Sequence, residues 1–134
     1  MARTVTHRKA ARGVRGRLGE HAEDHVARHL VANGWVVLDR NWCADQGEID
    51  IVALDPDGVC VFVEVKARRG EGFGPPLAAI TNEKIARVSL LGSAWLREQR
   101  LYPAETRVDR VGVLMRPGHP LELTHVRGLT QWGR

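Results

Sequence analysis

The stretch Gly47–Lys66, GEIDIVALDPDGVCVFVEVK, decides the fold that this chain is expected to adopt. Two runs rich in β-branched residues, 48–53 and 59–65, flank a Pro/Asp/Gly turn sequence, which predicts a β-hairpin. Proline early in the turn and glycine at its end favour a three-residue loop with a bulge at Gly58. That loop sets Asp55 opposite Val59 and thereby fixes the register of the two strands.

This register brings four ionisable side chains together. Because strand side chains alternate between faces, we expect Asp50 to face Glu64, and Glu48 to face Lys66. Opposed acids destabilise a sheet unless a cation neutralises them, and hard oxygen ligands favour Mg²⁺, Mn²⁺ or Ca²⁺ over zinc. The stretch therefore indicates a metal site. The alternative is that Asp50 and Glu64 lie on the solvent face beside basic neighbours, and a one-residue change of register would also separate them.

Lysine is rare in this chain. Of 20 basic residues only Lys9, Lys66 and Lys84 are lysine. A compact ammonium on a flexible stem can approach a bound water in ways that a guanidinium cannot, which indicates a specific role for Lys66. An arginine-rich genomic composition would produce the same excess of arginine.

A family resemblance is carried by these residues. Asp50, followed after 13 residues by Glu64-Val65-Lys66, resembles the PD-(D/E)XK signature of restriction-endonuclease-like nucleases. Gly47–Val52 with Phe62–Lys66, preceded by Gly16–Glu20, is similar to the bacterial YraN-type family of predicted endonucleases, relatives of the archaeal Holliday junction resolvases. The similarity also takes in Phe73-Gly74, Lys84 and Arg107-Val108-Asp109. Two positions depart from the pattern: Ile49 replaces the superfamily's proline, and Val108 stands where an aromatic residue is expected.

The resemblance implies roles for the acids and the lysine. Asp50 and Glu64 would hold one or two Mg²⁺ or Mn²⁺ ions, with the carbonyl of Val65 as a further ligand. Lys66 would position the attacking water or stabilise charge on the phosphate. Two further acids, Glu20 on the first helix and Glu48, are second-tier candidates. The resemblance thus implies a metal-dependent endonuclease that hydrolyses phosphodiester bonds in nucleic acid, with branched DNA as one candidate substrate, and it is compatible with a homodimer.

Composition agrees with one soluble domain. The chain has 134 residues, 43% of them hydrophobic and 27% charged. No apolar run approaches the roughly 20 residues that span a bilayer, and no signal-peptide region begins the chain, so we expect a cytoplasmic protein with no membrane partner. Cys43 and Cys60 lack metal-ligand spacing and are expected to be free thiols.

Positive charge is concentrated at the N-terminus. Residues 1–17 hold six basic residues and no acid, which leaves 14 of the 20 basic residues against all 16 acidic ones. We therefore expect a basic, flexible arm over residues 1–16 and a single nuclease-like domain over 17–134. Such an arm could bind phosphate, or could simply be solvated.

The remaining segments predict the order of elements. Leu18, Ala22, Val26 and Leu30 recur at helical spacing up to Asn33-Gly34, and on this helix Glu23 is expected at the surface. A strand is expected at 35–38, then a loop through Asn41 and Gln46, then the hairpin. After a loop at 67–76, a helix beginning between Leu77 and Thr81 is expected to run to Arg100, followed by strands at 107–115 and 121–126. The order α-β-β-β-α-β-β predicts an α/β protein with a restriction-endonuclease-like core, in which helices flank a mixed sheet of about five strands.

Four basic residues are candidates for binding nucleic acid. Arg68 and Arg69 are expected in the loop after Lys66, Lys84 in the first turn of the second helix, and Arg17 at the end of the arm. Two other readings stay open: a catalytically inactive nucleic-acid-binding or scaffold domain that keeps the nuclease fold, and a metal-dependent enzyme acting on another phosphorylated substrate.

Overall fold

The computed structural model of this chain describes residues 12–70 and 75–132. Most of the predicted basic arm, and Phe73-Gly74 of the family resemblance, lie outside the described residues. The helices are α1 (Arg12–Ala32), the 3₁₀ turn η1 (Pro76–Ala79) and α2 (Asn82–Gln99); the strands are β1 (Val36–Ala44), β2 (Gly47–Leu54), β3 (Cys60–Arg69), β4 (Glu105–Met115), β5 (Glu122–Val126) and β6 (Gln131–Trp132).

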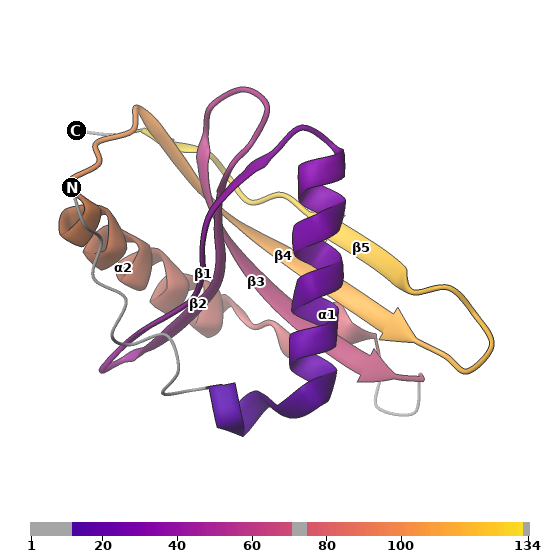
Figure 1. The fold of residues 1–134 in the computed structure, drawn as a ribbon. Helices are drawn as coiled ribbons and strands as arrows, with labels where there is room; N and C mark the ends of the chain where they lie inside the picture. The colour runs from indigo at the N-terminus through magenta and orange to yellow at the C-terminus, as the bar shows by residue number, and fades with distance from the viewer. Residues whose placement is uncertain (1–11, 71–74, 133–134) are drawn as a thin grey trace.

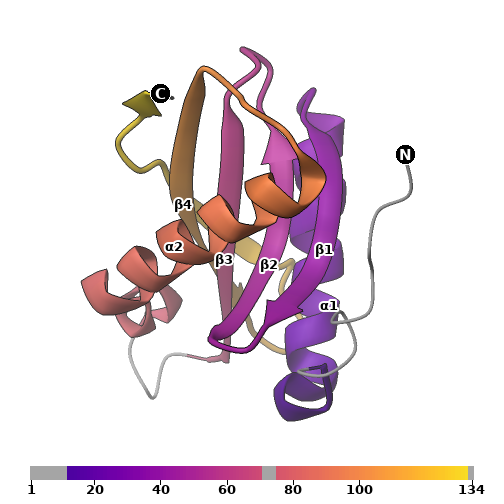
Figure 2. The ribbon, with the colours of Figure 1, turned by 90° about the vertical axis from the view of Figure 1, so that its left-hand side faces the viewer.

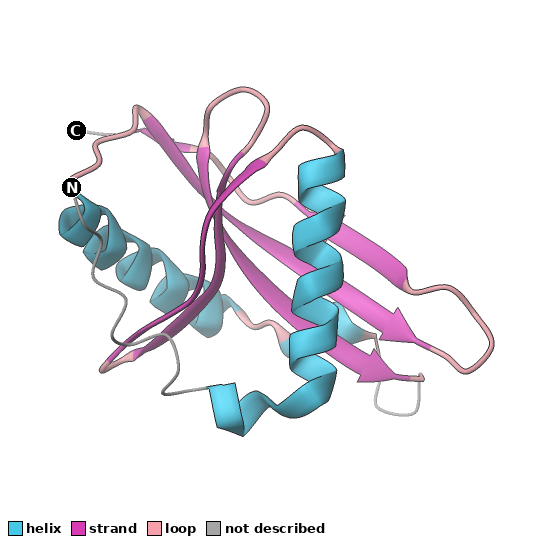
Figure 3. Ribbon diagram, viewed as in Figure 1, coloured by secondary structure: helices cyan, strands magenta, loops and turns pink. Residues whose placement is uncertain are grey.

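A mixed sheet forms the centre of the molecule (Figures 1 and 3). Its strands lie in the order β1-β2-β3-β4-β5, and the short β6 pairs with β4. Only β3 and β4 are parallel, because η1 and α2 carry the chain back between them, while the other neighbours are antiparallel. The predicted α/β class and the order α-β-β-β-α-β-β are confirmed.

The two long helices cover opposite faces of the sheet (Figure 2). Val26 and Leu30 of α1 pack with Val63 in one apolar cluster. Val88 and Trp95 of α2 pack in the other cluster, on the opposite face. Each helix therefore buries one stripe, as amphipathic helices do, and the sheet between them is apolar on both sides.

The central hairpin has the predicted turn and register. The backbone N–H of Gly58 donates to the carbonyl of Asp55 at 2.9 Å, and Gly58 has a φ of 86°, which glycine tolerates best. Leu54 pairs with Cys60, and this register continues as far as Ile51 and Val63. The pairing of β2 with β3 ends there, one position before Asp50 and Glu64.

Beyond that point the sheet forks. β2 stays paired with β1 down to Gly47, while β3 stays paired with β4 up to Arg69. Figure 1 shows β1 and β2 curving away from β3 below the fork. The predicted register made Asp50 and Glu64 direct partners on the two strands. In the structure they are not paired but lie on the two arms of the fork.

Two predicted loops are strand instead. β1 continues through Asn41 and Trp42 to Ala44, because Trp42 and Cys43 are buried and the segment pairs with β2. β3 includes Arg68 and Arg69, whose backbones pair with β4 rather than lying in a flexible loop. Tertiary pairing overrides the local turn composition in both places.

A buried ionic network joins the hairpin turn to β4. Arg107 is 5% exposed and donates to Asp109 from Nε at 2.8 Å and to Asp55 from Nη1 at 3.0 Å. Asp109 also lies 2.8 Å from Nε2 of His125 and accepts from the backbone N–H of Gly128. No helix in the described part of the chain combines the length and apolar character that crossing a membrane requires.

Candidate metal centre

A cavity of about 480 Å³ opens in the fork of the sheet. Its walls come from α1, β2, β3 and the beginning of α2. The ionisable residues that line it are Glu23, Glu48, Asp50, Glu64, Lys66, Arg68, Lys84 and Arg87. Acids and bases thus meet in one cavity, on segments that are distant in sequence.

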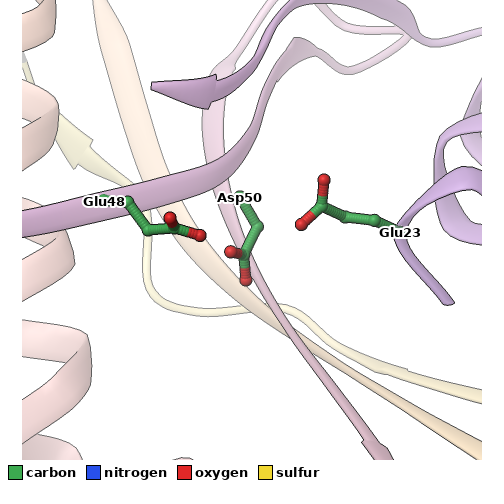
Figure 4. Close-up of side chains that lie close together, drawn as sticks. All are labelled: Glu23, Glu48 and Asp50. Atoms are coloured by element: carbon green, nitrogen blue, oxygen red, sulfur yellow. The ribbon is translucent and has the colours of Figure 1, made fainter. Parts of the chain in front are cut away.

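Three carboxylates form a tight cluster in this cavity. One oxygen atom from each of Glu23, Glu48 and Asp50 lies within 4.8 Å of the others. Figure 4 shows Glu48 and Asp50 on β2 and Glu23 reaching toward them from α1. Glu23 and Asp50 are only 1% and 5% exposed, so the alternative that Asp50 lies on the solvent face is wrong. Three negative charges this close, in a place with little water, call for a compensating positive charge.

Hydrogen bonds hold these carboxylates in place. The backbone N–H of Val65 donates to Oδ2 of Asp50 at 2.8 Å across the fork. The side-chain amide of Asn41 donates to Oε1 of Glu23 at 2.6 Å, and Nη2 of Arg40 lies 3.4 Å from the same oxygen. These bonds do not exhaust the carboxylates, because an ionised carboxylate has about four acceptor sites.

Glu64 and Lys66 lie on the other arm of the fork. Both are half-buried in β3 and line the same cavity, but the close cluster consists of Glu23, Glu48 and Asp50. Burial, followed by the nearby charges of Arg68 and Lys84, lowers the pKa of Lys66, although Glu64 and Asp50 oppose that shift. The predicted set Asp50, Glu64 and Lys66 is therefore brought to one cavity, and Val65 contributes at least its N–H group.

The donor set fits a hard divalent cation. All three clustered ligands are carboxylate oxygens, which suit Mg²⁺ or Mn²⁺, and a fourth carboxylate lies on the facing strand. The thiol of Cys43 lies 3.6 Å from Oε1 of Glu48 and is buried. Among the described residues, the close-ligand cluster contains no histidine or cysteine.

The first helix presents a different acid from the predicted one. Glu20 is half-buried on α1 and does not line the cavity, whereas Glu23 does. The prediction that Glu23 is a surface residue is wrong. The sequence held a signal for this, because Glu23 precedes Ala27 and Leu30 by four and seven residues, and both of these residues are buried on the apolar stripe.

The predicted nucleic-acid contacts separate into two places. Arg68 and Lys84 line the acid cavity, and Arg87, one helical turn after Lys84, joins them. Arg17 and Arg69 are exposed and line a second groove instead. Thr81 caps α2 by accepting from the backbone N–H of Lys84, so the helix start fixes where that lysine sits.

These features define the class of protein: an α/β domain whose forked mixed sheet holds a carboxylate cluster. The family model described as "Uncharacterised protein family UPF0102" matches residues 22–113, and the chain belongs to this family. A UPF0102 protein of Streptomyces griseus is 46% identical over 118 residues, which cover 87% of this chain and 98% of that protein. Another, from Rhodococcus opacus, is 43% identical over 110 residues, covering 82% and 92%. The family resemblance seen in the sequence is therefore confirmed at the level of the family.

Proposed function

We propose that this protein is a metal-dependent nuclease that hydrolyses phosphodiester bonds in nucleic acid. The observation that carries the proposal is the cluster of three carboxylate oxygens within 4.8 Å, in a cavity that also holds Lys66. The resemblance to PD-(D/E)XK nucleases supports it, because Asp50, Glu64 and Lys66 of that signature share the same cavity.

The acids would hold the cation. Glu23, Glu48 and Asp50 are the close ligands, and Glu64 completes the set from the other arm of the fork. A bound divalent cation supplies Lewis-acid polarisation of the phosphoryl oxygens and lowers the pKa of water. Asn41 and the N–H of Val65 keep two of the carboxylates oriented, as groups behind metal ligands commonly do.

Lys66 would act on the phosphate itself. Its ammonium group shares the cavity with the acids and can stabilise the negative charge that develops on the phosphoryl oxygens during attack. Lys84, Arg87 and Arg68 line the same walls and would bind the phosphates on either side of the reacting one. A polymer with one charge on each repeat suits this arrangement better than a small phosphorylated molecule.

The test combines metal binding with turnover. Titration calorimetry with Mn²⁺ is expected to show binding to the wild type, and Asp50→Asn and Glu23→Gln are each expected to weaken it about tenfold or more. Glu20→Gln is the matched control on the same helix and is expected to bind as the wild type does. Lys66→Ala is expected to keep the metal and lose cleavage of labelled DNA by a factor of about 10² to 10³.

Two results would overturn the proposal. Unchanged Mn²⁺ binding in both Asp50→Asn and Glu23→Gln would show that the cluster is not a metal site. Metal binding and DNA binding without any Mn²⁺-dependent cleavage of single-stranded, duplex or branched substrates would instead identify an inactive nucleic-acid-binding domain.

A further inference from the structure

A second groove, of about 420 Å³, runs next to the acid cavity. Its basic residues come from three places: Arg17 and His21 on α1, Arg69 at the end of β3, and Arg116 after β4. Leu18 lines both the groove and the acid cavity, so the two spaces adjoin.

The charges of this groove are available to a ligand. Arg17 and Arg69 are exposed, and neither forms an ion pair within the part of the chain that the structure describes. Arg116 is paired with Glu122, which holds its guanidinium at the groove while leaving further N–H donors. Leu18 and Met115 provide an apolar floor between these cations.

We propose that this groove binds the phosphates of a single nucleic-acid strand as that strand leaves the acid cavity. The inference rests on the proposed nuclease function and extends it to the path of the substrate. Arginine side chains with an apolar floor suit a sugar-phosphate backbone, since they bind phosphate oxygens through two N–H groups and contact the sugar. The groove adjoins the acid cavity through Leu18, so a strand held in the groove would continue directly from the reacting phosphate.

The positions of the cations indicate the path that a bound strand would follow across the molecule. Lys84 and Arg87 line the cavity from the α2 side, and the groove begins on the α1 side, so a strand would cross the acids between two sets of cations. Substrates with a single-stranded segment next to the reacting phosphate are therefore expected to bind more tightly than a fully paired duplex.

The experiment measures binding of a labelled single-stranded oligodeoxynucleotide of about 16 nucleotides by fluorescence anisotropy, in EDTA so that no cleavage occurs. The wild type is compared with Arg17→Ala/Arg69→Ala and with the control Arg97→Ala/Arg127→Ala, which removes two exposed arginines that line neither space. The slope of log K against log salt is expected to become shallower by about 1.4 in the groove variant, since each phosphate contact on a single strand contributes about 0.7. The control is expected to keep nearly the wild-type slope.

Each of three results would overturn the groove assignment. The salt slope of the groove variant could be unchanged, or its loss of binding affinity could be no larger than that of the control. The groove variant could also lose equal affinity for a duplex and for a single strand. This outcome is separate from failure of the nuclease proposal, which is measured by Mn²⁺-dependent cleavage. A shallower salt slope without any cleavage would support strand binding in the groove and contradict the nuclease proposal. Cleavage with an unchanged slope would support the nuclease proposal and contradict strand binding in the groove.

Discussion

Asn41 links backbone geometry to the carboxylate cluster. It is buried in β1 with a φ of 55°, a left-handed conformation that asparagine adopts more readily than most residues other than glycine. Its amide donates to Glu23 at 2.6 Å. The unusual backbone therefore aims a side chain that the cluster needs.

Two substitutions separate these contributions. Asn41→Gly keeps the backbone conformation accessible and removes the amide, while Asn41→Ala removes the amide and adds backbone strain. We expect both to weaken Mn²⁺ binding about tenfold, the lower end of what groups behind metal ligands contribute. Chemical denaturation is expected to find Asn41→Ala less stable than Asn41→Gly by about 1 kcal/mol. Equal stabilities would mean that the left-handed backbone costs alanine nothing here.

For single residues, the sequence predicted which side chains belong to the site better than it predicted how they are arranged. Asp50, Glu64 and Lys66 reach the same cavity, as strand alternation predicted, although the pairing of β2 with β3 ends before Asp50 and Glu64. Glu23 was missed because the apolar stripe of α1 was counted only at every fourth residue, which drifts around a helix of 3.6 residues per turn. The role of Asn41 depends on a positive φ, which residue type alone does not specify.

Helix α2 rests on β3 through a glycine. A Cβ atom added at Gly92 would lie 2.6 Å from Cε2 of Phe62, closer than real side chains approach. Phe62 is buried and its ring also contacts Trp95 edge-on, with ring centroids 6.3 Å apart. The distance between this helix and the sheet is therefore set by the missing side chain.

Replacing this glycine tests the packing. In an exposed helix Gly→Ala is stabilising by about 1 kcal/mol, but here we expect Gly92→Ala to destabilise by about 1 to 3 kcal/mol because the core becomes overpacked. Ser93→Ala, at the exposed neighbouring position, is the control and is expected to be neutral or slightly stabilising. Urea denaturation measures both, and a stabilised Gly92→Ala would show that α2 can move away from β3 without cost.

The buried network between the hairpin turn and β4 predicts acid sensitivity. Burial raises the pKa of Asp109, but hydrogen bonds from His125, Arg107 and Gly128 outweigh it, so the pKa is lowered. For Asp55 as well, burial raises the pKa and hydrogen bonds from Val59 and Arg107 outweigh it, leaving it lowered. These carboxylates therefore stabilise the fold above the ordinary carboxyl pKa, and that contribution is lost as pH falls through their folded-state values.

The free energy of unfolding of the wild type is thus expected to be nearly constant above about pH 5 and to fall below about pH 4. Asp109→Asn should lower it at neutral pH by about 3 to 5 kcal/mol, because Arg107 would keep a buried charge with one partner fewer. His125→Ala is a milder variant that keeps the arginine pair, and a shallower acid limb is expected for it. If the free energy of unfolding of His125→Ala fell at low pH as steeply as that of the wild type, this account would be contradicted.

Helices, strands and turns were predictable where the conformational preferences of the residues agree with the pairing of the strands in the fold. The Asp55–Gly58 turn and the cap at Thr81 follow from residue types with fixed conformational preferences. The length of β1 did not follow, because Asn41 resembles a loop residue until β2 lies beside it. The fork was also unpredictable, since it arises when β2 and β3 each keep a different neighbour.

On the scale of the whole molecule, the mutual repulsion of the three clustered acids is a term that opposes folding. They come from α1 and β2, and folding brings their charges to within 4.8 Å. At an effective dielectric constant near 20, two unit charges 4.8 Å apart repel by about 3.5 kcal/mol. We therefore expect Glu48→Gln to raise the melting temperature in EDTA, and Glu20→Gln, outside the cluster, to leave it nearly unchanged. A lower melting temperature for Glu48→Gln would mean that neighbouring cations already balance the cluster.

If the acids bind a cation as proposed, folding and ion concentration become one coupled equilibrium. The two arms of the fork and α1 carry the candidate ligands, so the complete set exists only when these three segments are assembled. An ion that binds the folded chain alone shifts the unfolding equilibrium by mass action, by about 2.7 kcal/mol at a hundredfold excess over Kd. The denaturation midpoint would then depend on the concentration of free Mn²⁺. The affinity of the site for Mn²⁺ could therefore be obtained from unfolding curves without any substrate.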